Sequence, residues 1–198
     1  MVKVCFFGDS LTTGMLSSGS DKYYPPSAVT ARAKSKWTVV NEGIPGDMLS
    51  EMPSRLSSLL RDSARKHRGS IDVIAFLGGT NDLRMGRKTE EIVSDLRNIA
   101  EISRTNGAAL IMITIPGNSS DAIAGIGAKR ASVNDFIVGE SEELNYTVVD
   151  ISSALPFGEE EGMYGEDGVH LTRKGYKKVG DLLLQALTAV LKRTSKEK

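Results

Sequence analysis

The sequence predicts an α/β protein: a three-layer α/β/α sandwich around a five-stranded, parallel, doubly wound sheet of the flavodoxin-like type. Two observations carry this prediction. Five short runs of apolar, β-branched residues occur along the chain, and longer segments with a helical spacing of apolar residues separate them. None of the five runs alternates cleanly between apolar and polar residues, which predicts strands buried on both faces by helices.

The predicted strands and helices alternate from the N-terminus onwards. The strands are predicted at residues 2–7, 38–41, 71–77, 108–115 and 147–151. Apolar residues recur at spacings of three and four between and after them, which predicts helices over residues 49–60, 92–102, 123–144 and 172–191. Gly125 and Gly127 weaken the start of the third helix, and Thr172 can cap the last one. A charged tail is predicted at residues 192–198.

Length and composition predict one domain spanning residues 1–198, because 198 residues with 40% hydrophobic content suffice for one substantial core. The 25 basic and 25 acidic residues cancel, so no nucleic-acid partner is predicted. The single cysteine, Cys5, excludes an intramolecular disulfide. Neither a signal peptide nor an apolar stretch of about 20 residues is found, so we expect a cytoplasmic location and no stable membrane insertion. The sequence predicts no oligomeric state.

Polar and glycine-rich blocks follow four of the apolar runs. They are Gly8-Asp9-Ser10-Leu11, Asn41-Glu42-Gly43-Ile44-Pro45-Gly46-Asp47, Gly78-Gly79-Thr80-Asn81-Asp82 and Asp167-Gly168-Val169-His170. Doubly wound sheets bind ligands outside the carboxyl ends of their strands, so we expect the four blocks to meet there. A Gly-Asp-Ser tripeptide alone is common by chance, and the ordered set of blocks is the stronger signal.

In this order and at these intervals, the four blocks resemble the signatures of the SGNH hydrolases, the subdivision of the GDSL esterase and lipase family named for its Ser, Gly, Asn and His. The resemblance extends from Gly8 to the helix after His170. It implies a serine ester hydrolase that needs no cofactor and no metal. It also implies a catalytic triad and an oxyanion hole, assigned as follows: Ser10, Asp167 and His170 as the triad, and Ser10, Gly46 and Asn81 as the oxyanion donors.

The triad can also be argued from chemistry. A serine hydroxyl becomes a good nucleophile only when an imidazole takes its proton, and that imidazole needs a carboxylate to fix its tautomer. Asp167 and His170 can supply this pair from one loop, with Nδ1 toward the aspartate and Nε2 toward Ser10. The other histidine, His67, lies in a basic run at a predicted helix end, where a cation suits the helix dipole.

The attacked carbonyl group would develop a negative charge on its oxygen, for which hydrogen-bond donors must be in place. The backbone N–H groups of Ser10 and Gly46 and the side-chain amide of Asn81 are the candidates. Gly46 follows Pro45, and the pair predicts a turn that brings bare backbone close to a ligand.

Structural roles are the alternative at each position. Asp9 and Asp82 are also candidates for a supporting role, and Asp47 and Asp82 are expected to hold loop backbone. Asp9 and Ser10 could instead cap a helix, and Gly43 and Gly46 could be ordinary turn glycines. Asn81 could close a turn with its own side chain, and His170 could be a histidine that merely precedes a helix.

Other functional classes find less support. No Gly-x-Ser-x-Gly pentapeptide occurs, which separates the chain from the other common class of serine hydrolase. One cysteine and two distant histidines give no metal-ligand spacing, and the acidic run 159–161 is expected to be a solvated loop. Nucleotide binding is the main competing hypothesis for a doubly wound sheet, but no Gly-x-x-x-x-Gly-Lys-Ser/Thr is present. A non-catalytic binding protein on this fold is the other alternative.

The choice of substrate is expected to lie in loops that the motifs do not define, at residues 15–36, 83–88, 116–129 and 152–166. The side chains that could line a substrate pocket are aromatic or apolar: Tyr23, Tyr24, Met48, Phe157, Met163, Tyr164 and Val169. Because no membrane-binding amphipathic stretch is present, a small soluble ester with a short acyl or acetyl group is favoured. Lysophospholipid, thioester and acyl-transfer chemistry are the alternatives on the same site.

Overall fold

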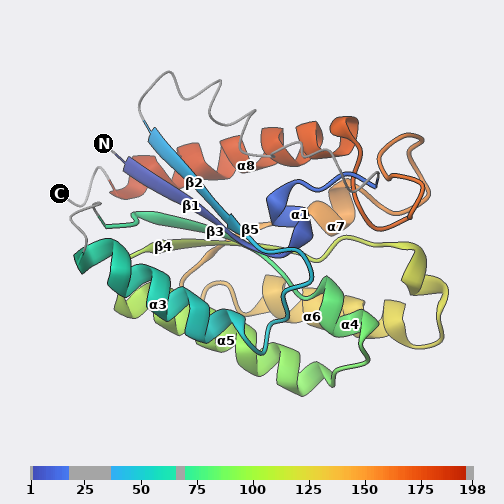
Figure 1. The fold of residues 1–198 in the computed structure, drawn as a ribbon, viewed down its shortest axis with the longest axis horizontal. Helices are drawn as coiled ribbons and strands as arrows, with labels where there is room; N and C mark the ends of the chain where they lie inside the picture. The colour runs from blue at the N-terminus through green and yellow to red at the C-terminus, as the bar shows by residue number, and fades with distance from the viewer. Residues whose placement is uncertain (1, 18–36, 66–69, 195–198) are drawn as a thin grey trace.

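The five predicted strands form one parallel sheet in the computed structural model, which describes residues 2–17, 37–65 and 70–194 (Figure 1). The order of the strands across the sheet is β2-β1-β3-β4-β5, which confirms the predicted flavodoxin-like type. Their bounds are β1 Val2–Gly8, β2 Trp37–Gly43, β3 Val73–Leu77, β4 Ala109–Ile113 and β5 Thr147–Val149. The predicted positions Tyr23, Tyr24 and His67 and the last four residues of the predicted tail lie outside the described residues.

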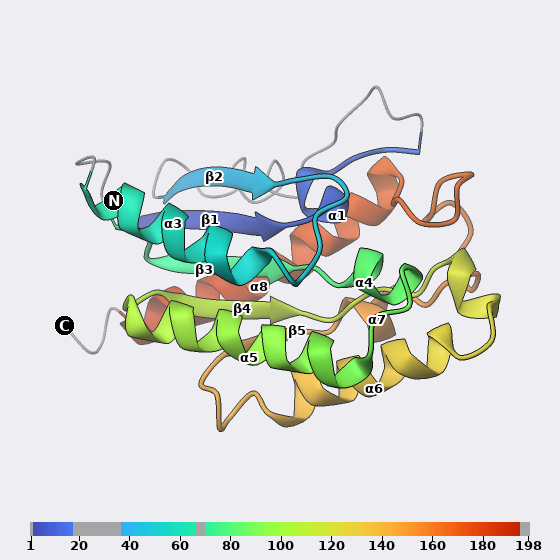
Figure 2. The same ribbon diagram turned by 60° about the horizontal axis from the view of Figure 1, so that its bottom comes forward.

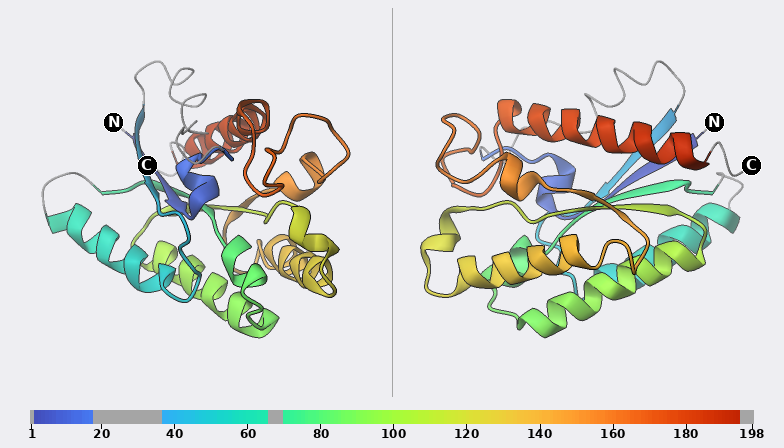
Figure 3. Two further views of the ribbon diagram at one scale, coloured as in Figure 1. Left: turned by 45° about the vertical axis from the view of Figure 1, so that its right-hand side comes forward. Right: turned by 180° about the vertical axis from the view of Figure 1, so that it is seen from behind.

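Helices cover both faces of the sheet, which confirms the three-layer sandwich (Figures 1 and 3). One face carries α3 Met52–Arg65, α5 Thr89–Thr105 and α6 Ile126–Gly139. The long α8, Arg173–Thr194, covers the other face together with the short α1, Ser10–Thr13, and α7, Ile151–Ala154. Two further short elements, α4 Thr80–Arg84 and the 3₁₀ helix η1 Ser119–Ala122, follow β3 and β4. None of the helices described for this chain has the length and apolarity needed to cross a membrane.

Two apolar clusters hold the layers together, one on each face of the sheet. Alternate residues of a strand point to opposite faces, so Cys5 and Phe7 of β1 pack toward α3 and α5. Val4 and Phe6 pack on the other side, toward α8. Because both sets are buried, the central strands show the near-continuous apolar runs that the sequence displays.

The predictions of strand burial and strand ends were wrong in part. The strands predicted at 38–41 and 147–151 are the edge strands β2 and β5, which are only partly buried, because each has a neighbouring strand on one side alone. The strand predicted at 147–151 ends at Val149, since the Asp150 side chain accepts from the Ser153 N–H and starts α7.

Two helix predictions also need correction. The helix predicted at 123–144 covers only Ile126–Gly139. Gly125, in a left-handed conformation with φ of 85°, delays its start, and residues 140–144 form a turn after its end. At the other end of the chain, α8 runs on to Thr194, so the first three residues of the predicted tail are helical. The predicted cap at Thr172 is confirmed, since its hydroxyl accepts from the Gly175 N–H at 3.2 Å.

Candidate active site

The register of the sheet brings the first three sequence blocks together. Gly8, at the end of β1, pairs with Gly43 of β2 on one side and with Leu77 of β3 on the other. A side chain at Gly8 would place its Cβ 1.8 Å from the Leu77 carbonyl oxygen, so the close approach of these strands requires glycine. The strands end where α1 and α4 lie, at the carboxyl edge of the sheet (Figure 2). The blocks therefore meet at the predicted edge.

Ser10, His170 and Asp167 form a continuous series of hydrogen bonds at this edge. Ser10, the first residue of α1, has its Oγ 3.0 Å from His170 Nε2. His170 Nδ1 lies 2.6 Å from Asp167 Oδ2. Donation by Nδ1–H to the carboxylate assigns the tautomer in which Nε2 accepts from the serine hydroxyl. The structure thus joins the three residues predicted from opposite ends of the chain.

The Asp167 carboxylate is held by more than the imidazole. Its Oδ1 accepts from the backbone N–H groups of Val169 and His170, both at 2.9 Å. Burial alone would raise the pKa of Asp167, but the hydrogen bonds from the His170 side chain and these two amides lower it below its usual value. Asp167 is therefore ionised at neutral pH, and its charge can stabilise an imidazolium ion formed during the reaction.

The loop between Asp167 and His170 has its own supports, which the sequence did not predict. Gly168 has a φ of 64°, and a side chain there would place its Cβ 2.7 Å from the Ser119 Cβ atom, so the loop requires glycine at this position. Ser119, the first residue of η1, donates its N–H to the Gly168 carbonyl at 2.8 Å. On the other side, the Gly165 N–H donates to the His170 carbonyl at 2.8 Å. These contacts fix the loop on one side to η1 and on the other side to the segment that precedes it.

Gly46 lies in a turn of the kind that its sequence predicts. The Asp47 N–H donates to the Ile44 carbonyl at 3.1 Å, Pro45 occupies the second position and Gly46 the third, with φ of 82°. This is the arrangement of a type II turn, which requires a positive φ at its third residue. The turn's hydrogen bond uses the Asp47 N–H and leaves that of Gly46 for another acceptor.

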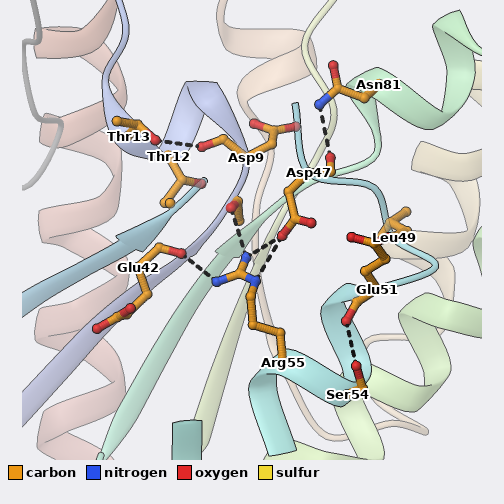
Figure 4. A network of polar contacts seen from close by, with 12 residues as sticks. Asp9, Thr12, Thr13, Glu42, Asp47, Leu49, Glu51, Ser54, Arg55 and Asn81 are labelled. Carbon is orange, nitrogen blue, oxygen red and sulfur yellow. Dashed lines mark hydrogen bonds and ion pairs between the residues drawn. The ribbon is translucent and has the colours of Figure 1, made fainter. Parts of the chain in front are cut away.

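Asn81 lies in the first turn of α4 and reaches across to the second block. Its Nδ2 donates to the Asp47 carbonyl at 2.9 Å, so one amide hydrogen anchors the side chain beside Gly46 (Figure 4). The second hydrogen of the same amide remains available as a donor. This contact spans two blocks, which differs from the local turn that was the alternative for Asn81.

Asp82 and Asp47 behave differently although both were expected to hold loop backbone. Asp82 is fully buried and accepts from the Leu49 N–H at 3.1 and 3.0 Å, as expected, while Arg87 pairs with it at 2.6 Å. The Asp47 carboxylate instead pairs with Arg55 of α3 at 2.6 Å. Arg55 is a residue that the sequence reasoning missed, because the helical pattern marks its element but not its partners.

Asp9 caps α1 and is completely buried. Its Oδ1 accepts from the Leu11 N–H at 2.9 Å, whereas Oδ2 finds no hydrogen-bond partner among the described residues. Burial raises the pKa of Asp9 to about 7, and the nearby charges of Asp82 and Asp47 add to this effect. The helix cap that was the alternative for Asp9 is therefore present.

Asp9→Asn is expected to stabilise the protein at alkaline pH. The raised pKa means that the folded state holds the Asp9 proton more tightly than the unfolded chain, so wild-type stability falls between about pH 4 and pH 7. Asparagine keeps the acceptor for Leu11 and carries no charge. Relative to wild type, the variant should gain about 2 to 4 kcal/mol in free energy of unfolding between pH 5 and pH 8. Urea denaturation at both pH values measures this gain.

The matched control for this experiment is Asp135→Asn, at an exposed aspartate of α6. Its difference from wild type should stay within about 0.5 kcal/mol at either pH. A free-energy gain for Asp9→Asn that is the same at pH 5 and pH 8 would rule out a buried charge as its cause.

An open pocket of about 560 Å³ adjoins the Asp167 loop. Phe157 and Tyr164, two of the predicted lining residues, contribute to it and contact each other edge to face at 4.9 Å. Met163 and Val169, also predicted to line a pocket, are instead buried, and Met163 packs in the apolar cluster under α8. Within the acidic run, Glu160 pairs with Lys174 and Lys178 of α8. No cluster suited to a metal ion occurs among the described residues.

The fold and the hydrogen-bonded Ser, His and Asp side chains at the sheet's carboxyl edge define an α/β protein of the SGNH hydrolase type. The chain belongs to the GDSL-like lipase/acylhydrolase family, whose model matches residues 6–178. This match confirms the resemblance drawn from the four sequence blocks. A comparison with curated proteins found no match.

Solved structures share the fold at low sequence identity. A lipase/acylhydrolase from Enterococcus faecalis is 23% identical with a TM-score of 0.73, covering 93% of this chain and 94% of its own. A lipolytic G-D-S-L family protein from Veillonella parvula is 21% identical with a TM-score of 0.73, covering 95% and 99%. The esterase EstA from Pseudoalteromonas, in a structure inhibited by monoethylphosphonate, is 15% identical with a TM-score of 0.76, covering 97% and 100%.

Proposed function

We propose that this protein is a serine hydrolase that cleaves carboxylic esters through an acyl-enzyme on Ser10. The observation that carries the proposal is the series of hydrogen bonds from Asp167 through His170 to Ser10, at 2.6 and 3.0 Å. Both distances lie within the range for a nucleophile, its base and the group that orients the base. Membership of a family of lipases and acylhydrolases supports the same chemistry.

In the first step, Ser10 Oγ attacks the ester carbonyl while His170 Nε2 takes the hydroxyl proton. The carbonyl oxygen becomes negative, and the proposed donors to it are the N–H groups of Ser10 and Gly46 and the Asn81 amide. His170 then gives the proton to the departing alcohol, leaving the acyl group on Ser10. Asp167 holds the imidazole in the required tautomer throughout.

In the second step, His170 takes a proton from a water molecule, which attacks the acyl-enzyme. Collapse of the second tetrahedral intermediate returns the proton to Ser10 and releases the acid. An alcohol in place of water would give acyl transfer through the same step. None of these steps requires a cofactor or a metal ion.

We propose a small ester with a short acyl or acetyl group as the substrate. The pocket beside the Asp167 loop is open and carries acidic side chains, Glu159 and Glu166 among them, on its lining. Such a lining does not favour a long apolar chain or an anionic headgroup. EstA, which shares the fold, is itself described as an esterase.

A series of p-nitrophenyl esters from acetate to octanoate tests this proposal. We expect kcat/KM to be highest at acetate to butyrate and to fall about tenfold or more by octanoate. Thermal unfolding should be measured in parallel with ATP, NAD and flavin nucleotides, and no shift is expected. A rise in kcat/KM toward octanoate would favour a lipid substrate. A large nucleotide shift without turnover of any ester would favour a nucleotide-binding protein instead.

A further inference from the structure

Arg55 makes a set of contacts that the proposed mechanism does not use. It lies in α3 and extends toward the ends of β1 and β2, with 22% of its side chain exposed. Its guanidinium carbon lies 3.8 Å from the centroid of the Phe7 ring, so the planar group stacks on a residue of β1. Figure 4 shows the guanidinium at the centre of a network of polar contacts.

The three nitrogens of this guanidinium reach three parts of the site, and two of them, Nε and Nη2, share the Asp47 carboxylate. Nη2 donates to the Gly8 carbonyl at 3.0 Å, two residues before Ser10. Nη1 donates to the Glu42 carbonyl at 2.8 Å, at the end of β2. Nε donates to the Asp47 carboxylate at 2.8 Å, next to Gly46. One side chain therefore joins the strand that leads to the nucleophile to the turn that carries Gly46.

Asp47 is consequently held at three points. Its N–H closes the type II turn onto Ile44, its carbonyl accepts from Asn81, and its carboxylate pairs with Arg55. Only 6% of the Asp47 side chain is exposed, so this ion pair is shielded from water on the Asp47 side. Because Gly46 and Asn81 both adjoin Asp47, movement of Asp47 would displace both proposed oxyanion donors.

We propose that Arg55 is a positioning residue for the oxyanion hole, acting through Asp47 on Gly46 and Asn81. The inference rests on the proposed function, since it assumes that these two residues donate to the oxyanion. A displacement of about 1 Å in such donors can cost about a hundredfold in rate. Lysine cannot replace arginine here, because the three acceptors lie around a planar, multiply donating group.

The test compares Arg55→Met and Arg55→Lys with wild type on p-nitrophenyl acetate. Methionine keeps an apolar side chain over Phe7 and removes the donors. We expect both variants to lose about 10- to 100-fold in kcat, with KM changed by less than about threefold, because the donors act on the transition state. Circular dichroism and thermal unfolding establish that each variant is folded at the assay temperature.

Arg97→Met is the matched control. Like Arg55, Arg97 pairs with a carboxylate, that of Glu140 at 3.1 Å, and its guanidinium carbon lies over an aromatic ring, 4.9 Å from the centroid of Phe136. These contacts lie between α5 and the end of α6, and none of them involves a residue of the proposed active site. Its replacement removes the same kinds of contact and should leave kcat within about twofold of wild type. Asp47→Asn keeps the two backbone hydrogen bonds of residue 47 and weakens its ion pair with Arg55. Its loss in kcat should be similar to that of Arg55→Lys, and it replaces Arg55→Met in the test if that variant does not fold.

A double-mutant cycle with Asn81→Ala separates positioning from a general loss of stability. If Arg55 acts through Asp47 on the oxyanion donors, Arg55→Lys should cost at least about threefold less in the Asn81→Ala background than in the wild-type background, because only the Gly46 donor is left to displace. The same loss in both backgrounds, or a folded Arg55→Lys with wild-type kcat, would overturn the inference. Absence of turnover in the wild-type protein would instead overturn the proposed function, and the inference with it.

Discussion

Ser10→Ala is expected to lower kcat by about 10⁴- to 10⁶-fold, because it removes the atom that forms the acyl bond. The fold should be unaffected. Ser10 is 9% exposed, its side chain meets His170, and the cap from Asp9 to Leu11 does not involve its hydroxyl. We expect the free energy of unfolding to change by less than about 1 kcal/mol. Turnover of p-nitrophenyl acetate and urea denaturation measure the two quantities.

Ser54→Ala is the control for this substitution. Ser54 is an exposed serine of α3 whose hydroxyl donates to the Glu51 carbonyl within the same helix region. Removal of the Ser54 hydroxyl should leave the turnover of p-nitrophenyl acetate unchanged. If Ser10→Ala kept more than a tenth of wild-type kcat while folded, another residue would have to be the nucleophile.

His170→Ala is expected to cost about as much as Ser10→Ala, because the serine hydroxyl would then lack a base. The two losses should not multiply. Removal of either residue disables the same proton transfer, so the double variant should be no slower than the worse single variant within about threefold. Steady-state kinetics of the two single variants and the double variant measure this coupling. Multiplying losses would show that Ser10 and His170 act independently, against the series of hydrogen bonds.

The local features of the site could be predicted because neighbouring residues determine them. Asp167 and His170 are three positions apart, and the turn at Pro45 and Gly46 depends on a proline φ and a positive glycine φ. Both appear in the structure as the sequence indicated. The roles of these residues in catalysis stay predictions.

The contacts that join distant elements could not be predicted. Arg55 reaches Asp47, Glu42 and Gly8 across three elements, and the helical spacing of apolar residues in α3 does not say which polar residue turns inward. The support of Gly168 by Ser119 likewise depends on how η1 and the last loop pack together. An arginine near the start of an amphipathic helix was the signal for Arg55, but such residues are most often solvated.

The architecture could be predicted where the residues of a segment determine it, and less well where the position of the segment among the other elements determines it. The central strands are buried on both faces, and their sequences are nearly continuous apolar runs for that reason. The partial exposure of β2 depends on the strand order, which no local pattern encodes. The apolar spacing continues past Gly139, so the early end of α6 could not be predicted from it, whereas Gly125 did indicate that the start was weak.

Labelling with a fluorophosphonate probe, followed by mass spectrometry of the labelled peptide, tests the central claim most directly. The probe reacts with a serine only when a base activates it. We predict one adduct, on Ser10, in the wild-type protein, and none in Ser10→Ala or His170→Ala. Labelling of Ser10→Ala to the wild-type extent, or an adduct on any serine other than Ser10, would contradict the assignment of the nucleophile.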